Sequence, residues 1–545
     1  MNIRNYNILF HTHTISGIII SAALYVIFFA GSYSFFRDDI EAWERNEPAK
    51  ESVFLETDIN ALVENLAIAH DLKFRDITLS QHKISQRINV SLSAPKDTLD
   101  ESRQRAAFFY MNLNDYSTSE YKNAYTLGEF LYRLHFFAQL NLYGRSGYLF
   151  AGIVSFFFLF ALITGVWIHW DKIISNFYLF RPKAKLKNLW TDAHTALGII
   201  GLPYQFIFAL TGVFLIIGTT VLAPPVLSII YKGDQESMYA DMGFGLPAYK
   251  PSFQSLDNVP DLNFYVEEVQ KSWGEFDLRS ISLFAYGDQN MRIIIEGVPL
   301  PASKFTGKGK AIFKAGDLAP EYEVDPYGPS SYLQGSNDVL RKLHFGDFGG
   351  LGLRIVYFIL GLVSCVVILS GVLIWLVARD KKSTPDIKRK FNKWLVWIYL
   401  AICLGMYPVT AISFLAVKLW MSNSGLSPME FIYHWYFYGW LIISISLVAL
   451  RDNFKITKWS MLSGAILGLA IPISNGYQTG NWLWKTFNSD QIQIYTVDML
   501  WLLTSILSFW AAYMMHKKDN STSPVEHNDN QTTKLKEKSV KYQNV

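Results

Sequence analysis

The segment Leu131-Tyr-Arg-Leu-His135-Phe136 recurs later in the chain as Leu340-Arg-Lys-Leu-His344-Phe345, and each copy precedes a long apolar stretch. A second pair of segments opens two other apolar stretches, where His13-Thr-Ile-Ser-Gly17 matches His194-Thr-Ala-Leu-Gly198. Similarity of this kind within one chain indicates an internal structural repeat. The repeat therefore places one histidine beside each of four apolar stretches.

The similarity extends beyond these motifs and defines two copies of one unit. Ten residues after the histidine, Arg145 in the first copy matches Arg354 in the second. Residues 11–170 and 192–378 are therefore predicted to form two copies, each with a span, an outer segment and a second span. Because both copies run in the same direction, we expect a pseudo-twofold axis along the membrane normal.

The composition indicates a membrane protein. Of 545 residues, 50% are hydrophobic and 17% are charged, whereas soluble domains carry about 25% charged residues. A wholly soluble enzyme and a disordered chain are therefore excluded. The net charge of +3 gives no basic footprint for nucleic acid. Only Cys365 and Cys403 are present, both in apolar runs, which predicts neither a disulfide framework nor a thiolate metal site.

Eight stretches are long and apolar enough to cross a bilayer, which takes about 20 residues. They lie near residues 14–36, 147–170, 195–222, 355–378, 394–418, 431–450, 459–477 and 494–515. Lys and Arg concentrate in loops 171–193, 379–393 and 451–458, while the alternate loops nearly lack them. The positive-inside rule then predicts that both termini are cytoplasmic and that the two large polar segments lie on the outer side.

Each large polar segment has a helical pattern followed by alternating, strand-like residues. Ile59–Leu72 precedes strand-like Ile88–Leu92, and Leu262–Trp273 precedes strand-like Met291–Glu296. The predicted fold is a mainly α membrane protein with a duplicated four-helix core, four appended helices and two small periplasmic α+β modules. The predicted parts are a first span (1–37), module 1 (38–130), an interfacial segment and span (131–170), a cytoplasmic loop (171–193), a third span (194–223), module 2 (224–338), an interfacial segment and span (339–378), a cytoplasmic loop (379–393), the appended bundle (394–515) and a disordered tail (516–545).

The predicted axis brings the repeated histidines together as two pairs. His13 and His194, here called the inner pair, lie at the cytoplasmic ends of helices, and His135 and His344, the outer pair, lie just beyond the opposite membrane surface. Ionisable residues at membrane depth indicate function, and neutral imidazole is a common axial ligand of haem iron. We therefore expect the four histidines to bind two b-type haems.

Other interpretations of the histidines remain open. A bare zinc site usually needs four ligands, and a copper site needs Met or Cys, neither of which recurs here. A lone interfacial histidine often has a structural role, and His11 or His169 could replace an inner ligand. Gly17 and Gly198 favour the haem interpretation, because each lies one helical turn after its histidine and leaves room for a flat macrocycle.

Several of these motifs together resemble the PepSY-associated transmembrane helix family. They are His194-Thr-Ala-Leu-Gly198, Thr211-Gly212, Leu343-His344-Phe-Gly-Asp-Phe-Gly-Gly350 and Ser370-Gly371 with Trp375. The resemblance covers about residues 8–380 and implies that the outer modules are PepSY domains. That family includes bacterial inner-membrane ferrisiderophore reductases that carry haem, which implies haem ligation by His13, His135, His194 and His344. His135 continues Phe-Phe-Ala-Gln instead of Phe-Gly-Asp-Phe, and the chain from Trp394 onward lies outside the pattern.

The expected function is electron transfer across the bacterial inner membrane, from the inner to the outer pair and on to a periplasmic acceptor. The resemblance implies that this acceptor is a ferric siderophore, which releases its iron on reduction to Fe(II), so the chain would be a ferrisiderophore reductase-like haem oxidoreductase. No nucleotide-binding fingerprint is present, so the donor is a separate cytoplasmic reductase or a quinol, and membrane lipid surrounds the spans. Arg145 and Arg354 would pair with haem propionates or with lipid headgroups. The alternative is a non-enzymatic membrane anchor whose PepSY-like modules bind a periplasmic protein or peptide.

Overall fold

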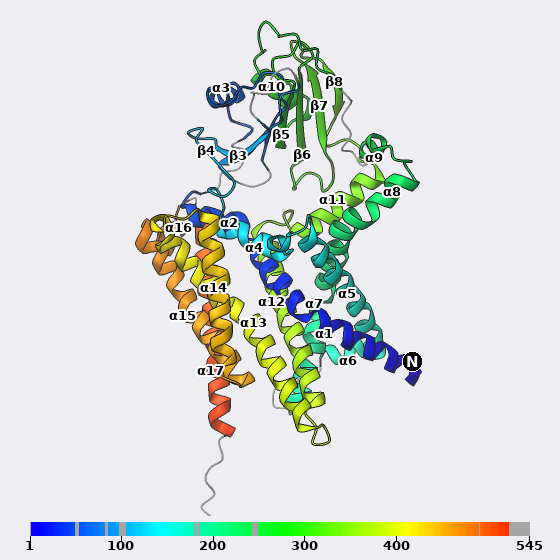
Figure 1. The fold of residues 1–545 in the computed structure, drawn as a ribbon, viewed down its shortest axis with the longest axis vertical. Helices are drawn as coiled ribbons and strands as arrows, with labels where there is room; N and C mark the ends of the chain where they lie inside the picture. The colour runs from blue at the N-terminus through cyan, green and yellow to red at the C-terminus, as the bar shows by residue number, and fades with distance from the viewer. Residues whose placement is uncertain are drawn as a thin grey trace, which may run out of the picture.

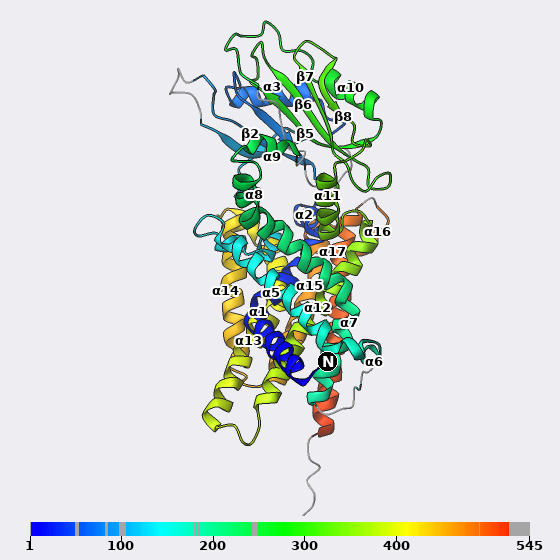
Figure 2. The same cartoon turned by 90° about the vertical axis from the view of Figure 1, so that its right-hand side faces the viewer.

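The computed structural model describes residues 2–48, 54–81, 85–97, 105–178, 181, 186–241, 249–489 and 491–522. It is mainly helical, and eight of the described helices are long and apolar enough to cross a membrane, as the sequence predicted. These helices lie side by side below a domain built on a β-sheet (Figures 1 and 2). Residues 523–545 of the predicted tail and residues 182–185 of the predicted loop 171–193 lie outside the described residues.

Four helices form a closed ring in the first two thirds of the chain. They are α1 (Ile3–Ser34), α5 (Ser146–His169), α7 (Leu186–Val213) and α12 (Gly350–Arg379). Helix α1 packs on α5 and α12, and α7 packs on the same two helices. The third span follows α7 through a π-helical segment, Phe214–Leu222. It is longer than predicted at both ends, because α7 begins at Leu186 and α8 (Ala223–Ile229) continues past residue 222.

The remaining spans form a second bundle of α13 (Asp386–Leu419), α14 (Pro428–Val448), α15 (Asn453–Thr479) and α17 (Ile492–Thr522). It contacts the ring through α13 and contacts α2 (Arg37–Arg45) through α17. At the second contact, Trp43 Nε1 donates to Asp498 at 2.8 Å and Asn475 Nδ2 donates to the same carboxylate at 2.9 Å. All three residues are fully buried. A buried carboxylate satisfied by two donors fixes this interface in one arrangement.

The two outer segments do not form two separate modules, so that prediction is wrong. They form one eight-stranded antiparallel sheet in the order β4-β3-β2-β1-β5-β6-β7-β8. The strands are β1 (Ile77–Ser80), β2 (Arg87–Leu92), β3 (Ala107–Asn112), β4 (Thr118–Ser119), β5 (Phe276–Phe284), β6 (Arg292–Pro299), β7 (Gly309–Lys314) and β8 (Pro320–Val324). Helices α3 (Ile59–Ala69) and α10 (Asn263–Trp273) share one hydrophobic core with the sheet. A four-stranded half with one helix would leave β1 as an open edge, and pairing with β5 removes that edge.

The two halves of the sheet domain make equivalent contacts with each other at their junction. Strands β1 and β5 pair from Ile77 opposite Leu283 to Ser80 opposite Ser280. At the starts of the two helices, the Asn60 side chain accepts from the Leu262 N–H, and the Asn263 side chain accepts from the Ile59 N–H, both at 2.8 Å. Each asparagine also donates to an aspartate of the other half, Asn60 to Asp261 and Asn263 to Asp58. The segments 58–60 and 261–263 therefore make the same contacts with each other.

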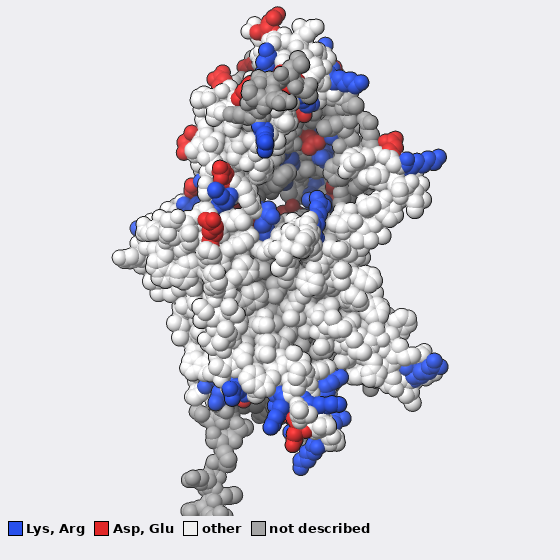
Figure 3. Space-filling view, viewed as in Figure 1, with Lys and Arg blue, Asp and Glu red and all other residues white. Residues whose placement is uncertain are grey.

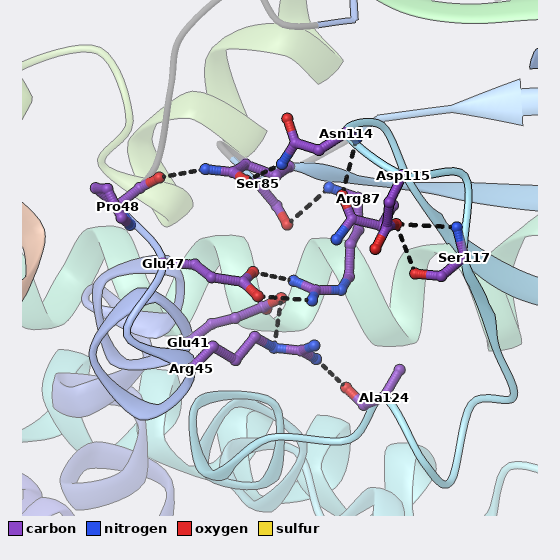
Figure 4. A network of polar contacts seen from close by, with 12 residues as sticks. Glu41, Arg45, Glu47, Pro48, Ser85, Arg87, Asn114, Asp115, Ser117 and Ala124 are labelled. Carbon is purple, nitrogen blue, oxygen red and sulfur yellow. Dashed lines mark hydrogen bonds and ion pairs between the residues drawn. The ribbon is translucent and has the colours of Figure 1, made fainter. Parts of the chain in front are cut away.

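Short helices connect the sheet to the membrane spans. They are α2, α4 (Leu127–His135), α9 (Gln235–Asp241) and α11 (Tyr332–Phe345). Beyond the end of α2, Glu47 receives two hydrogen bonds from Arg87 of β2, and Arg45 bonds the Ala124 carbonyl (Figure 4). Bidentate pairs of this kind are among the strongest polar contacts. The sheet is thus fastened to α2, which continues directly from α1.

The charged residues are unevenly distributed between the two ends of the helices. In Figure 3, Lys and Arg gather at the end away from the sheet, while the flanks of the helices are almost free of charge. The loop between α12 and α13 carries Lys381 and Lys382, and the start of α13 carries Lys388, Arg389 and Lys390. The N-terminus lies toward the same end (Figure 1).

Candidate functional site: two histidine pairs

The inner pair joins two helices of the ring. The ring centres of His13, from α1, and His194, from α7, are 6.2 Å apart. His13 Nδ1 lies 2.9 Å from the Ala161 carbonyl on α5, and His194 Nδ1 lies 2.9 Å from the Val367 carbonyl on α12. Because a carbonyl only accepts, each Nδ1 carries the proton, and each neutral imidazole keeps its Nε2 lone pair for a metal.

Both inner histidines lie inside their helices and not at the helix ends that the sequence predicted. Helix α1 begins at Ile3 and α7 at Leu186, about two to three turns earlier. The first turns of both helices carry polar residues, among them Asn5, Asn7, Asn188 and Asp192, and therefore lie outside the apolar windows that defined the predicted spans. The pair is therefore enclosed by the ring of four helices.

The outer pair is held by the two interfacial helices. His135 ends α4, His344 lies in the last turn of α11, and their ring centres are 6.0 Å apart. His135 Nδ1 donates to the Ile27 carbonyl at 2.7 Å. His344 Nδ1 lies 2.8 Å from the Thr211 hydroxyl, which donates its own proton to the Ile207 carbonyl at 2.6 Å and so accepts from the imidazole. Burial lowers the pKa of both outer histidines, which keeps them neutral.

The two pairs lie at different depths. The residue that supports His135 is Ile27, fourteen positions after His13 on the same helix, which corresponds to about 21 Å along the axis. Phe28, Tyr204 and Phe208 fill part of the space between the pairs, with successive ring centres 6.3 and 4.3 Å apart, and Phe208 lies 5.2 Å from His344.

The spacing of both pairs would suit one haem iron held between two imidazoles. Two bonds of about 2 Å from one iron to facing imidazole nitrogens set the ring centres about 6 Å apart, which agrees with the distances in both pairs. Beside the inner pair, a Cβ added at Gly17 would meet no atom within 4 Å, and one at Gly198 would meet only Val367, at 4.0 Å. The glycines therefore leave open space next to their histidines.

Other glycines allow the imidazole rings of the histidines to lie directly against helix backbones. An added Cβ would lie 2.5 Å from His135 Nδ1 at Gly31, 3.0 Å from His13 at Gly165 and 3.2 Å from His194 at Gly371. Gly371 belongs to the Ser370-Gly371 motif, but its match with Gly165 was not predicted, because these glycines are 206 residues apart whereas Arg145 and Arg354 are 209 apart. Allowing a three-residue gap would align Thr164-Gly165 with Ser370-Gly371.

The sequence departure after His135 does not alter the local backbone. Gly346, two residues after His344, ends α11 in the left-handed conformation with φ of 66°. Phe137, at the matching position, adopts φ of 55°. A left-handed phenylalanine costs about 1–2 kcal/mol, and its packing on Phe150, with ring centres 5.1 Å apart, offsets part of that cost.

The other candidate ligands are placed differently. Among the described residues, no group of three or more His, Cys, Asp or Glu side chains is arranged to hold a bare metal ion. Arg354 is paired with Asp39, and Arg145 is exposed. His11 is exposed as well.

Comparison with known proteins agrees with this architecture. The family profile of the PepSY-associated TM region matches residues 10–378. The chain is also 23% identical over 287 residues to the uncharacterized protein PA4219 of Pseudomonas aeruginosa, covering 51% of this chain and 69% of that protein. The matched region contains the ring of four helices, the sheet domain and all four histidines, and the second bundle lies beyond it. The chain is a multi-pass membrane protein that belongs to the PepSY-associated TM family.

Proposed function

We propose that this protein is a membrane oxidoreductase that binds two b-type haems and carries electrons outward to a periplasmic acceptor. One observation carries the proposal: two histidine pairs, with ring centres 6.2 and 6.0 Å apart, each have both Nδ1 atoms bonded to acceptors. This arrangement fixes the tautomer that binds iron through Nε2.

The chain's own residues supply binding, orientation and exclusion of water. The inner pair would hold one haem and the outer pair the other, and a bound haem supplies reversible one-electron oxidation and reduction. The Ala161, Val367 and Ile27 carbonyls and the Thr211 hydroxyl fix the plane of each imidazole and increase its basicity. Burial of the outer pair favours a neutral ligand over an imidazolium.

The sidedness of the protein follows from its cations. The Lys and Arg residues at the end away from the sheet favour a cytoplasmic location for that end and for both termini. The inner pair then faces the cytoplasm of a bacterium and the sheet lies in the periplasm. The four contacts of the ring and the reciprocal Asn60 and Asn263 bonds support a duplicated core with a pseudo-twofold axis.

The proposed acceptor is a ferric siderophore. One electron converts Fe(III) to Fe(II), which hard oxygen ligands hold far less tightly, so the chelator releases iron without itself being changed. A separate cytoplasmic reductase or a membrane quinol would supply the electrons.

The haem content tests the proposal. Protein purified in detergent from haem-sufficient cells should give two b-type haems per chain by pyridine haemochrome, with α and β bands that sharpen on reduction with dithionite. Colourless protein would contradict the proposal and favour a non-enzymatic anchor that binds a periplasmic protein or peptide.

Single variants test the pairing. His13→Ala and His194→Ala should lose the same haem, and His135→Ala and His344→Ala should lose the other one. His434→Ala, on an exposed face of α14, is the matched control and should keep both haems. Loss of different haems within one pair would show that the partners are wrongly assigned.

A further inference from the structure

A recess lies between the sheet domain and the membrane helices, and Figure 3 shows both basic and acidic side chains inside it. One face of the sheet is covered by α3 and α10, and the opposite face turns toward α9 and α11 (Figure 1). That second face carries charged residues where the first is apolar. Lys310 of β7 and Glu296 of β6, for example, form an ion pair at 3.1 Å.

Helix α11 forms the opposite wall and ends at the outer pair. The loop between β6 and β7 contacts α11, since the Gly307 N–H donates to Asp338 at 3.1 Å, and it also contacts the turn after α11, where Phe305 packs on Phe348 with ring centres 5.0 Å apart. Lys342 also lies over the Phe305 ring, at 5.2 Å. The wall of the recess is therefore continuous with the segment that supplies His344.

Positive charge exceeds negative charge in this recess. The basic residues are Arg279, Lys308, Lys310, Arg341 and Lys342, and the acidic residues are Asp277, Glu296, Asp338 and Asp347, so the basic residues outnumber the acidic ones by one. Glu296 is shared by two lysines, at 3.1 and 3.5 Å. Arg279 is paired with Asp277 at 2.6 Å, and the heads of Arg341 and Lys342 lie over the rings of Phe345 and Phe305. Asp338 and Asp347 offset part of the charge of Lys342. Like charges collected in a partly enclosed space favour an anionic ligand.

We propose that the recess binds the acceptor as an anionic ferric chelate, held by Arg279, Arg341 and Lys342, in place of a neutral or cationic one. This inference rests on the proposed function for the source of the electron, but its binding step depends only on these side chains. The chelate lies beside the last turn of α11, and one electron reduces its Fe(III) to Fe(II) while the chelator is released unchanged. The site thus selects its substrate by charge before any electron moves.

Binding of redox-inert Ga(III) chelates tests the recess separately from haem chemistry. Calorimetry in detergent should show that a trianionic Ga(III) tris-catecholate binds and that a neutral Ga(III) tris-hydroxamate binds at least about tenfold more weakly. The double variant Arg279→Gln/Lys342→Gln should weaken binding of the anion by about tenfold or more and leave the neutral chelate unchanged. The double variant Lys388→Gln/Lys390→Gln, at the opposite end of the protein, is the charge-matched control.

Equal binding of the two chelates, or no effect of the double variant, would overturn the inference even if both haems are present. Loss of tris-catecholate binding in anionic phosphatidylglycerol nanodiscs, with binding retained in zwitterionic ones, would overturn it by assigning the charges to lipid headgroups. A colourless protein that binds the anion as expected would instead overturn the proposed function and leave the recess as an anion site. The Fe(III) forms of both chelates then serve as oxidants of the dithionite-reduced protein, and the double variant should raise the half-saturating concentration for the anion alone.

Discussion

The inner and outer pairs reach nearly the same ring separation with different degrees of symmetry. In the inner pair, both imidazoles donate to a carbonyl at 2.9 Å and both lie against a glycine, Gly165 or Gly371. In the outer pair, His135 donates to a carbonyl and His344 to the hydroxyl of Thr211. The comparison indicates that the position of the ring is preserved while the group that supports it differs between the two halves.

Gly31→Ala should have the largest effect, because it removes one half of the outer pair. The added Cβ would lie 2.5 Å from His135 Nδ1, and the ring cannot retreat without breaking its bond to Ile27. Pyridine haemochrome should fall from two haems to about one per chain, although alanine by itself favours the helix by about 1 kcal/mol. Gly165→Ala and Gly371→Ala, with contacts of 3.0 and 3.2 Å, should cause smaller and similar losses of the inner haem.

The control for Gly31 is Gly335→Ala on α11, where an added Cβ meets nothing within 4 Å. Combining Gly31→Ala with His135→Ala should cause no further loss, whereas combining it with His13→Ala should remove both haems. Equal effects at Gly31 and Gly165 would contradict the difference between the pairs.

Thr211→Val should have an intermediate effect, confined to the outer pair. It removes the acceptor for His344 Nδ1, and loss of such a supporting group costs about 10- to 100-fold in ligand affinity. Ser370→Ala is the matched variant in the inner pair. The Ser370 hydroxyl lies 3.2 Å from His194 Nδ1, but the Val367 carbonyl would remain as acceptor. Haem retention during dilution and the midpoint potential of each haem should shift for Thr211→Val and change little for Ser370→Ala.

Glu44→Gln should have the smallest effect on haem content but should change how stability depends on pH. Glu44 accepts the N–H of Leu127, the first residue of the helix that carries His135, and burial raises the pKa of Glu44 to about 7. The folded protein then binds this proton more tightly than the unfolded chain does, so stability is lost as the pH rises from about 4.5 through 7. The maximal penalty is about 3 kcal/mol.

Thermal unfolding in detergent measures this dependence. The wild-type protein should unfold at a lower temperature than Glu44→Gln at pH 8, and the two should converge near pH 5. A constant difference across that range would show that the carboxyl does not titrate there. Both proteins should keep two haems at pH 6.

The membrane helices and the histidines could be predicted from sequence because their signals are local. Apolar stretches identify the eight spans, and the motifs at His135 and His344 recur without a gap. The function, the haems and the sidedness stay predictions until the measurements above are made. Thr211 had no predicted role, because its contact with His344 joins residues 133 positions apart on helices whose facing sides the repeat does not specify.

The single sheet could not be predicted for a related reason. The strand patterns near Ile88–Leu92 and Met291–Glu296 are present in the structure as β2 and β6. Alternation identifies a strand and its buried face but not its neighbour. Nothing in the sequence around Ile77 therefore indicates that its partner is Leu283, which follows two intervening membrane helices along the chain.

The pairing of β1 with β5 has a consequence for biogenesis. When the first half of the sheet emerges, β1 is an exposed edge, and its partner arrives only after α5 and α7 have entered the bilayer. An open edge of this kind invites aggregation. The two strands can pair only if both halves of the sheet are on the same side of the bilayer. Formation of the complete sheet therefore requires that the intervening membrane helices have inserted with the correct topology.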